Sequence, residues 1–150
     1  MVNSKKTVKN SRRSSKSKSL RSKCLKAIQL LARISATNDF GIAQCVSCGK
    51  KQHYKDMDGG HFIPKGKSSY WALKIDNIHP QCKGCNGFGM RNGTAAQQYT
   101  LWMQDRYGYD FVKNMFATQK NICKIYASEY EEMLKDFNDQ INKHRKRLGE

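Results

Sequence analysis

Apolar residues recur at helical spacing near both ends of the chain, whereas the stretch between them is polar and rich in turn-forming residues. Near the N-terminal end, this spacing predicts an amphipathic helix from residue 20 or 23 to about residue 36. Its apolar positions are Cys24, Ala27, Ile28, Leu31 and Ile34. The turn-forming residues 37–41 end this helix, which has one face available to dock on a core.

Three helices are predicted in the C-terminal part of the chain. Thr94 can cap a helix that reaches about Arg106, and Gly108 ends it. Asp110 can cap a short helix that follows. A longer helix is predicted over residues 120–147, with an apolar stripe formed by Ile122, Tyr126, Tyr130, Met133, Leu134, Phe137 and Ile141.

The middle of the chain, residues 45–92, has too few apolar residues for a hydrophobic core of its own. We expect short strands near residues 55–63 and 74–79, an irregular loop over 64–73, and a helix that begins near Cys82 or Cys85. A metal cross-link would supply the stability that such a small, polar region lacks.

The distribution of charge gives further information about the N-terminal end and about the chain as a whole. Residues 1–23 consist mostly of Lys, Arg, Ser and Asn, which predicts a disordered basic arm. The arm could be a solubilising tail or bind phosphates, and the absence of acidic residues before Asp39 favours nucleic acid. Lys and Arg number 28 against 12 acidic residues, a formal charge of +16 that is typical of nucleic-acid binders.

Residues 1–19 contain no apolar run of the signal-peptide kind, and no stretch approaches the length of a membrane span. We therefore expect an intracellular protein with no membrane partner. Residues 24–150 should form a single domain, divided into a leading helix (24–40), a cross-linked core (45–93) and C-terminal helices (94–150).

Two Cys-x-x-Cys pairs bound the polar core and account for four of the six cysteines. In a reducing compartment, Cys45, Cys48, Cys82 and Cys85 indicate a zinc site, with paired disulfides or coincidence as the alternatives. Four thiolates fill the tetrahedral shell of zinc, so this zinc is expected to be structural. Cys24 and Cys123 are expected to be buried on helix faces.

The segment between the cysteine pairs has the residue types that phosphodiester hydrolysis needs. His61 can act as a base, Asp58 and Asn86 offer oxygen atoms to a hard cation, and Lys65, Lys67 and Arg91 can contact phosphates. The alternatives are an Asx-turn role for Asp58 and a structural role for His61. His53 and His144 are expected to be surface residues.

The order of these motifs resembles a known family. Cys45-Val-Ser-Cys48-Gly, Asp58-Gly-Gly-His61-Phe, Asn77-Ile-His79-Pro-Gln-Cys82 and Cys85-Asn86 resemble the bacteriophage NinG (Rap) recombination nucleases, in the HNH branch of the His-Me finger endonucleases. The resemblance covers roughly residues 25–145. It implies an α+β fold in which a zinc-stapled ββα-metal (HNH) finger is flanked by N- and C-terminal helices.

The resemblance also implies an activity and residue roles. It implies a Mg²⁺- or Mn²⁺-dependent endonuclease that cuts branched DNA, such as Holliday junctions or D-loops, during phage recombination in the host-cell cytoplasm. His61 matches the general base, Asn77 the residue that braces the loop between the strands, and Asn86 the metal-binding position of the helix. Many HNH enzymes have a metal-binding Asp directly before the histidine, but this chain has Gly60, so Asp58 is the candidate replacement.

Some assignments remain open at this stage. His79 can orient a phosphate or simply pack in the core, and Asn77 can be an ordinary turn-capping residue. A non-enzymatic zinc module that binds nucleic acid or scaffolds a recombination complex would explain the cysteines and the charge equally well. A general or sequence-specific HNH nicking nuclease is a further alternative. Symmetric cutting of a four-way junction predicts a homodimer, and phage or host recombination proteins are further expected partners.

Overall fold

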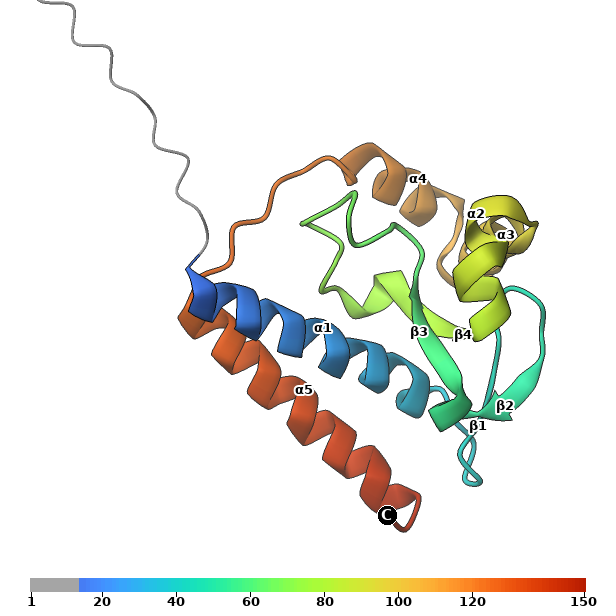
Figure 1. Ribbon diagram of the computed structural model, residues 1–150. Helices are drawn as coiled ribbons and strands as arrows, with labels where there is room; N and C mark the ends of the chain where they lie inside the picture. The colour runs from blue at the N-terminus through green and yellow to red at the C-terminus, as the bar shows by residue number, and fades with distance from the viewer. Residues whose placement is uncertain (1–13) are drawn as a thin grey trace, which may run out of the picture.

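The computed structural model describes residues 14–150, which form five α-helices and two small antiparallel sheets (Figure 1). The helices are α1 (Ser15–Ser35), α2 (Met90–Asn92), α3 (Ala95–Tyr107), α4 (Tyr109–Thr118) and α5 (Ala127–Arg147). The strands are β1 (Ile42–Gln44), β2 (Lys51–His53), β3 (Met57–His61) and β4 (Ile78–Cys82). The predicted α+β class with flanking helices is confirmed.

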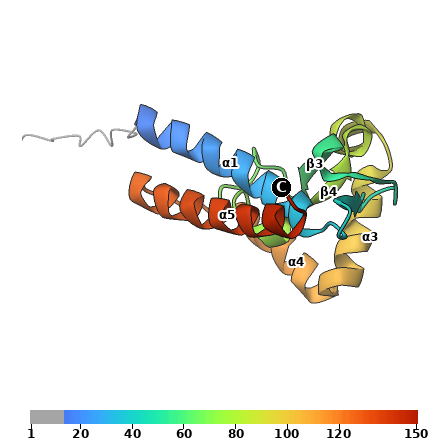
Figure 2. The same cartoon turned by 90° about the horizontal axis from the view of Figure 1, so that it is seen from below.

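The first and last helices, α1 and α5, lie side by side in both views (Figures 1 and 2) and run in the same direction. Near their N-terminal ends, Lys16 forms an ion pair with Glu131. At their C-terminal ends, Arg147 donates hydrogen bonds to the carbonyl of Ile34 and to Thr37. Between these ends the two helices share a core with residues from β4 and the preceding loop: Cys24, Ile28, Leu31, Ala72, Leu73, Ile78, Tyr130, Phe137 and Ile141.

A second core lies on the other side of the molecule, where α3 and α4 pack against the loop that joins β3 to β4. Its buried members are Val46, Phe62, Ile63, Trp71, Tyr99, Met103, Val112 and Met115. The Trp71 ring nitrogen donates to Thr118 Oγ1 at the end of α4, over 3.0 Å. The strand pair is thus held between two helical layers.

The two strand pairs are joined through the cysteine region. β3 and β4 pair in a register that sets Asp58 opposite Gln81 and His61 opposite Ile78. β1 and β2 form a small hairpin around Cys45 and Cys48 that was not predicted, because three-residue strands carry little periodicity. The backbone N–H of Val46 donates to the carbonyl of Pro80 over 3.0 Å, which ties this hairpin to β4.

The helix α1 begins at Ser15, several residues before the predicted start, so the predicted disorder of residues 15–23 is wrong. Ser14 caps the helix by accepting a hydrogen bond from the N–H of Ser17. Leu20 packs against the core that α1 shares with α5, and Lys16 pairs with Glu131 of α5. These tertiary contacts stabilise a polar segment whose own sequence does not favour folding. Residues 1–13 of the predicted arm lie outside the described residues.

The C-terminal helices also differ in their boundaries. Residues 121–126 form no regular secondary structure, so α5 starts at Ala127, and Ile122 is 89 % exposed instead of part of the stripe. The N–H of Tyr126 donates to Glu129, which caps α5. Asp110 lies in the first turn of α4, where Gly108 with its positive φ holds the cap position. Thr94 precedes α3, but its side chain makes no capping hydrogen bond.

Over residues 14–150, none of the helices combines the length and the apolar character that crossing a membrane requires.

Candidate functional site

The four cysteines of the two pairs lie together, with all their sulfur atoms within 4.8 Å of one another. Cys48 Sγ and Cys82 Sγ are 3.8 Å apart, close to the separation of about 3.8 Å expected for two sulfurs on a tetrahedral zinc with Zn–S bonds of about 2.3 Å. No disulfide joins any of the six cysteines, all of which are among the described residues. The cluster could therefore hold a metal ion such as zinc.

The chemistry of the cluster fits a cation better than four free thiols. Burial and the neighbouring sulfurs raise the pKa of the Cys85 thiol, because a thiolate there would lie among other sulfur atoms. A bound metal removes this cost, since it deprotonates the thiols that ligate it. Only Cys48 is exposed, and Cys45 packs with Ala43 and Met57 in a small core.

The cysteine cluster positions the segment that follows β4. Cys85 begins a π-helical turn, η3 (Cys85–Gly89), which runs directly into α2. Asn86 is the second residue of this turn, and its Nδ2 donates to Oδ2 of Asp58 in β3 over 3.0 Å. Asp58 and Asn86, predicted from the sequence as oxygen donors, are thus brought together from positions 28 residues apart.

His61 ends β3 and is partly buried. Its Nε2 lies 2.8 Å from the carbonyl oxygen of Ala72 in the loop between the strands. A carbonyl only accepts hydrogen bonds, so Nε2 carries the proton and Nδ1 of the neutral ring is an acceptor. Burial lowers the pKa of His61 below its ordinary value of 6.5, and the positive charges of Lys65 and Arg21 lower it further, against the hydrogen bond to Ala72. The ring is therefore neutral near pH 7.

Asn77 is completely buried and braces the loop between the strands. Its Oδ1 accepts from the N–H of Ile63 over 2.7 Å, and its Nδ2 donates to the carbonyls of Ile63 and Trp71. Because the same loop carries Ala72, these bonds also fix the acceptor that orients His61.

The structure contradicts the phosphate-binding role considered for His79. This side chain is only 9 % exposed, and both of its ring nitrogens lie 2.9 Å from tyrosine hydroxyls, those of Tyr99 and Tyr107. Tyr99 donates in turn to the carbonyl of Gly60 over 2.8 Å. Burial, and to a smaller extent the charge of Arg106, lowers the pKa of His79 to about 4. His79 is a neutral packing residue that links β4 to α3.

The three basic candidates are exposed but lie on different segments. Lys65 and Lys67 belong to the loop after β3, and Arg91 lies in α2, close in sequence to Asn86. The other two histidines, His53 in β2 and His144 in α5, are partly exposed and lie outside this site. Nothing in the described contacts ties the three basic side chains to a partner, which leaves them available to a polyanion.

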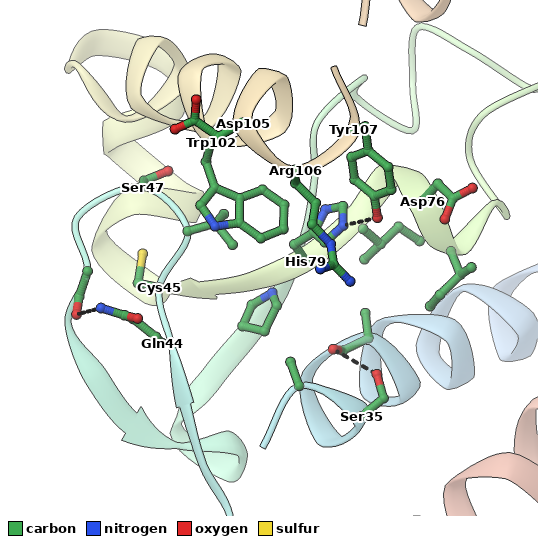
Figure 3. A pocket seen from close by; sticks show the side chains of 17 residues that line it. Ser35, Gln44, Cys45, Ser47, Asp76, His79, Trp102, Asp105, Arg106 and Tyr107 are labelled. Atoms are coloured by element: carbon green, nitrogen blue, oxygen red, sulfur yellow. Dashed lines mark hydrogen bonds between the residues drawn. The ribbon is translucent and has the colours of Figure 1, made fainter. Parts of the chain in front are cut away.

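A cavity of about 790 Å³ lies elsewhere, between the end of α1, the first cysteine pair, β4 and the end of α3. Figure 3 shows His79, Arg106 and Tyr107 gathered on one of its walls. His61, Asp58 and Asn86 do not line it. The candidate site is consequently the surface formed by β3 and η3, and not this cavity.

Sequence reasoning missed several groups at this site. The carbonyl of Ala72 has no sequence signal, because any residue could provide it. Tyr99 lies within the helix predicted after Thr94, but its spacing gives no sign of its bonds to His79 and to the carbonyl of Gly60. Gln81 stands opposite Asp58 in the strand register. Because side chains alternate along a strand, the sequence could have indicated that Gln81 lies on the same face of β4 as His79.

Comparison with known proteins supports the resemblance of the motifs. Residues 2–147 match the model of a protein family described as bacteriophage lambda NinG protein. No curated protein and no solved structure matches the chain. The family match spans nearly all of the 150 residues, including the cysteine pairs and the β3–β4–η3 unit, and the chain therefore belongs to the NinG family.

Proposed function

We propose that the protein is a divalent-metal-dependent DNA endonuclease of the HNH type. The observation that carries this proposal is the convergence of a neutral, oriented histidine with a carboxylate–amide pair on one strand–strand–helix unit next to the cysteine cluster. A structural histidine would not need a ring nitrogen that has no hydrogen-bond partner among residues 14–150, and a zinc module alone would not need the Asp58–Asn86 pair.

The donor set around Asp58 and Asn86 fits a hard cation such as Mg²⁺ or Mn²⁺. A carboxylate can only accept, so Asn86 presents its nitrogen to Asp58 and leaves Oδ1 free to face β3. One carboxylate and one or two neutral oxygens are the kind of protein ligands that Mg²⁺ takes together with water and phosphate. When bound there, the cation supplies positive charge to the phosphate and to the departing oxygen.

His61 supplies the base. With the proton of the neutral ring held on Nε2 by Ala72, Nδ1 can accept a proton from an attacking water. Asn77 holds the loop that carries Ala72 and so acts as a positioning residue.

The open edge of β3 is where both groups can reach one phosphate. Successive residues of a strand point to opposite faces, so His61 and the position of Gly60 face opposite sides. β3 pairs with β4 alone in its sheet. At the start of its other edge, Arg33 of α1 donates to the carbonyl of Met57 over 2.7 Å, and no strand among residues 14–150 pairs with the part of this edge that ends in His61. A phosphate at this edge can be approached from both faces of the strand.

Charge and family suggest the substrate. The formal charge of +16 supports a nucleic-acid partner, and Lys65, Lys67 and Arg91 are the proposed phosphate contacts near the site. The resemblance to phage recombination nucleases favours branched DNA, inside the infected cell. A symmetric cut across a four-way junction would require a dimer, whereas a monomer would nick, and the mass in solution separates the two.

Cleavage assays test the proposal directly. The zinc-loaded protein would be incubated with branched, duplex and single-stranded DNA, with Mg²⁺, Mn²⁺ or EDTA. We expect metal-dependent cleavage, fastest on branched DNA, that His61→Ala reduces by at least about 100-fold. His144→Ala is the matched control on α5. If wild type binds DNA but never cleaves it, or His61→Ala cleaves equally well, the protein is a binding or scaffolding module instead.

A further inference from the structure

Gln81 is a completely buried amide whose orientation is set by its partner. Its Nε2 lies 2.9 Å from Oγ of Ser47, and Ser47 donates its single proton to the carbonyl of Ala95, also over 2.9 Å. Ser47 can therefore only accept from Gln81. The nitrogen of the amide faces Ser47, and Oε1 must point the other way.

That buried oxygen lacks a hydrogen-bond donor among residues 14–150. An unsatisfied buried acceptor destabilises the folded state, so its presence calls for an explanation. The bond to Ser47 explains only the nitrogen of the amide. Oε1 has no structural role that the surrounding contacts reveal.

Gly60 shows where the oxygen points. A Cβ placed on Gly60 would overlap Oε1 of Gln81 and would lie 3.0 Å from Oδ1 of Asn86. Both oxygens therefore lie next to the position that the side chain of a larger residue at position 60 would occupy. Asp58 is on the same face, since it pairs directly with Gln81 and bonds to Asn86.

We propose that Gln81 Oε1 is the strand-side ligand of the divalent cation, in the place of a side chain at position 60; the inference rests on the function proposed above. The cation would be held by one carboxylate, from Asp58, and two amide oxygens, from Gln81 and Asn86. Neutral oxygens suit Mg²⁺ or Mn²⁺, which need few protein ligands when phosphate and water complete the shell. Gly60 is then glycine because Gln81 fills its side-chain space.

Mn²⁺ binding to the zinc-loaded full chain, measured without DNA, tests this ligand. The EPR signal of free Mn²⁺ reports how much of the metal is bound. Gln81→Leu keeps the bulk but removes the oxygen, and should weaken Mn²⁺ binding by at least about ten-fold, the loss seen even when groups that only support a ligand are removed. Gln81→Glu restores an oxygen and should bind Mn²⁺ at least as tightly as wild type. Gln52→Leu is the matched control, because Gln52 also has a buried oxygen without a donor among the described residues, but in β2.

A ligand exchange keeps the test decisive even if Gln81→Leu does not fold. Gln81→Ala should lose Mn²⁺ binding, and Gly60→Asp combined with Gln81→Ala should recover it, because the new carboxylate enters the space vacated by the amide. Failure of the double variant to recover binding, or wild-type binding by a folded Gln81→Leu, would overturn the inference.

The outcomes also separate this inference from the proposed function. If wild type binds Mn²⁺ and cleaves DNA while Gln81→Leu does both equally well, only the role of Gln81 is wrong. If the Mn²⁺ binding pattern holds but no DNA is cut, the ligand assignment stands and the nuclease proposal fails. If wild type shows no saturable Mn²⁺ binding but cleaves DNA, the ligand assignment fails and the nuclease proposal stands, and if it neither binds Mn²⁺ nor cleaves DNA, both fail.

Discussion

Asn86 donates a hydrogen bond to Asp58 over 3.0 Å and so connects the turn that follows the second cysteine pair to the strand that ends in His61. The contact joins the two parts of the candidate site, and it depends on the cysteine cluster, which holds the start of η3 beside β3.

Loss of the Asp58 charge should weaken the response to metal. In Asp58→Asn the new amide oxygen can still accept from Asn86, so the fold should persist, but the only carboxylate of the site is gone. We expect the Mg²⁺ concentration for half-maximal cleavage to rise by at least about ten-fold. Asp56→Asn, at an exposed position in the turn before β3, is the control and should respond like wild type. An unchanged Mg²⁺ response in Asp58→Asn would remove Asp58 from the site.

The cleavage activity should fall as the pH drops below 6.5. The pKa of His61 is lowered, mainly by burial and also by Lys65 and Arg21, so the neutral base predominates at and above pH 6.5 and disappears only at lower pH. Lys65→Gln removes one of the charges that lower this pKa, so the acid limb of kcat/KM should move to higher pH. A limb that stays in place or moves to lower pH would contradict the assignment of His61 as the base.

The cysteine cluster should account for much of the stability. Cys45→Ser removes a buried cysteine of the cluster and should lower the zinc content. It should also lower the free energy of unfolding by at least about 3 kcal/mol, which corresponds to a fall of roughly 6 to 12 °C in the thermal midpoint. Calorimetry and metal analysis measure both. Cys123→Ser, outside the cluster, should change neither. Equal melting of Cys45→Ser and wild type, with no zinc in either, would show that the cluster holds no structural metal.

The buried His79 should make the fold sensitive to acid. Its pKa is about 4 in the folded state and near 6.5 when unfolded, so the unfolded chain binds an extra proton between these values. Stability is therefore complete above pH 6.5 and falls as pH drops towards 4, by up to roughly 3 kcal/mol. Urea unfolding at pH 7.5, 6 and 5 measures the loss. His79→Phe should be less stable at pH 7.5 but show a shallower decline, and an unaltered decline would assign the acid sensitivity to other groups.

Phosphate contacts should appear in the salt dependence of binding. In the inactive His61→Ala background, adding Arg91→Ala should weaken DNA binding and reduce the slope of log K against log salt by about 0.9 for B-DNA. The same is expected for Lys67→Ala. Lys135→Ala on α5, where Lys135 pairs with Asp139, is the control. Slopes measured by fluorescence anisotropy that match the control would place the DNA elsewhere.

Helix boundaries show where local sequence was insufficient. Residues 15–23 are polar and were predicted to be disordered, yet they are helical because α5 lies along them and Lys16 meets Glu131. Conversely, Ile122 fits the helical period but lies in a segment without regular secondary structure before α5. Apolar spacing indicates which face can be buried, whereas contact with a distant element decides whether the helix forms.

For the site, the amino-acid sequence by itself determined which chemical groups are present: two cysteine pairs, three histidines and three aspartates between them, amides and an excess of positive charge. These follow from composition and spacing alone. Only the tertiary structure decided which atoms face the site. His79 is buried by two tyrosines from α3, and Gln81 turns its oxygen towards Gly60 because Ser47, 34 residues earlier, can only accept. Hydrogen-bond partners from distant segments orient such side chains, and local sequence carries no record of that pairing.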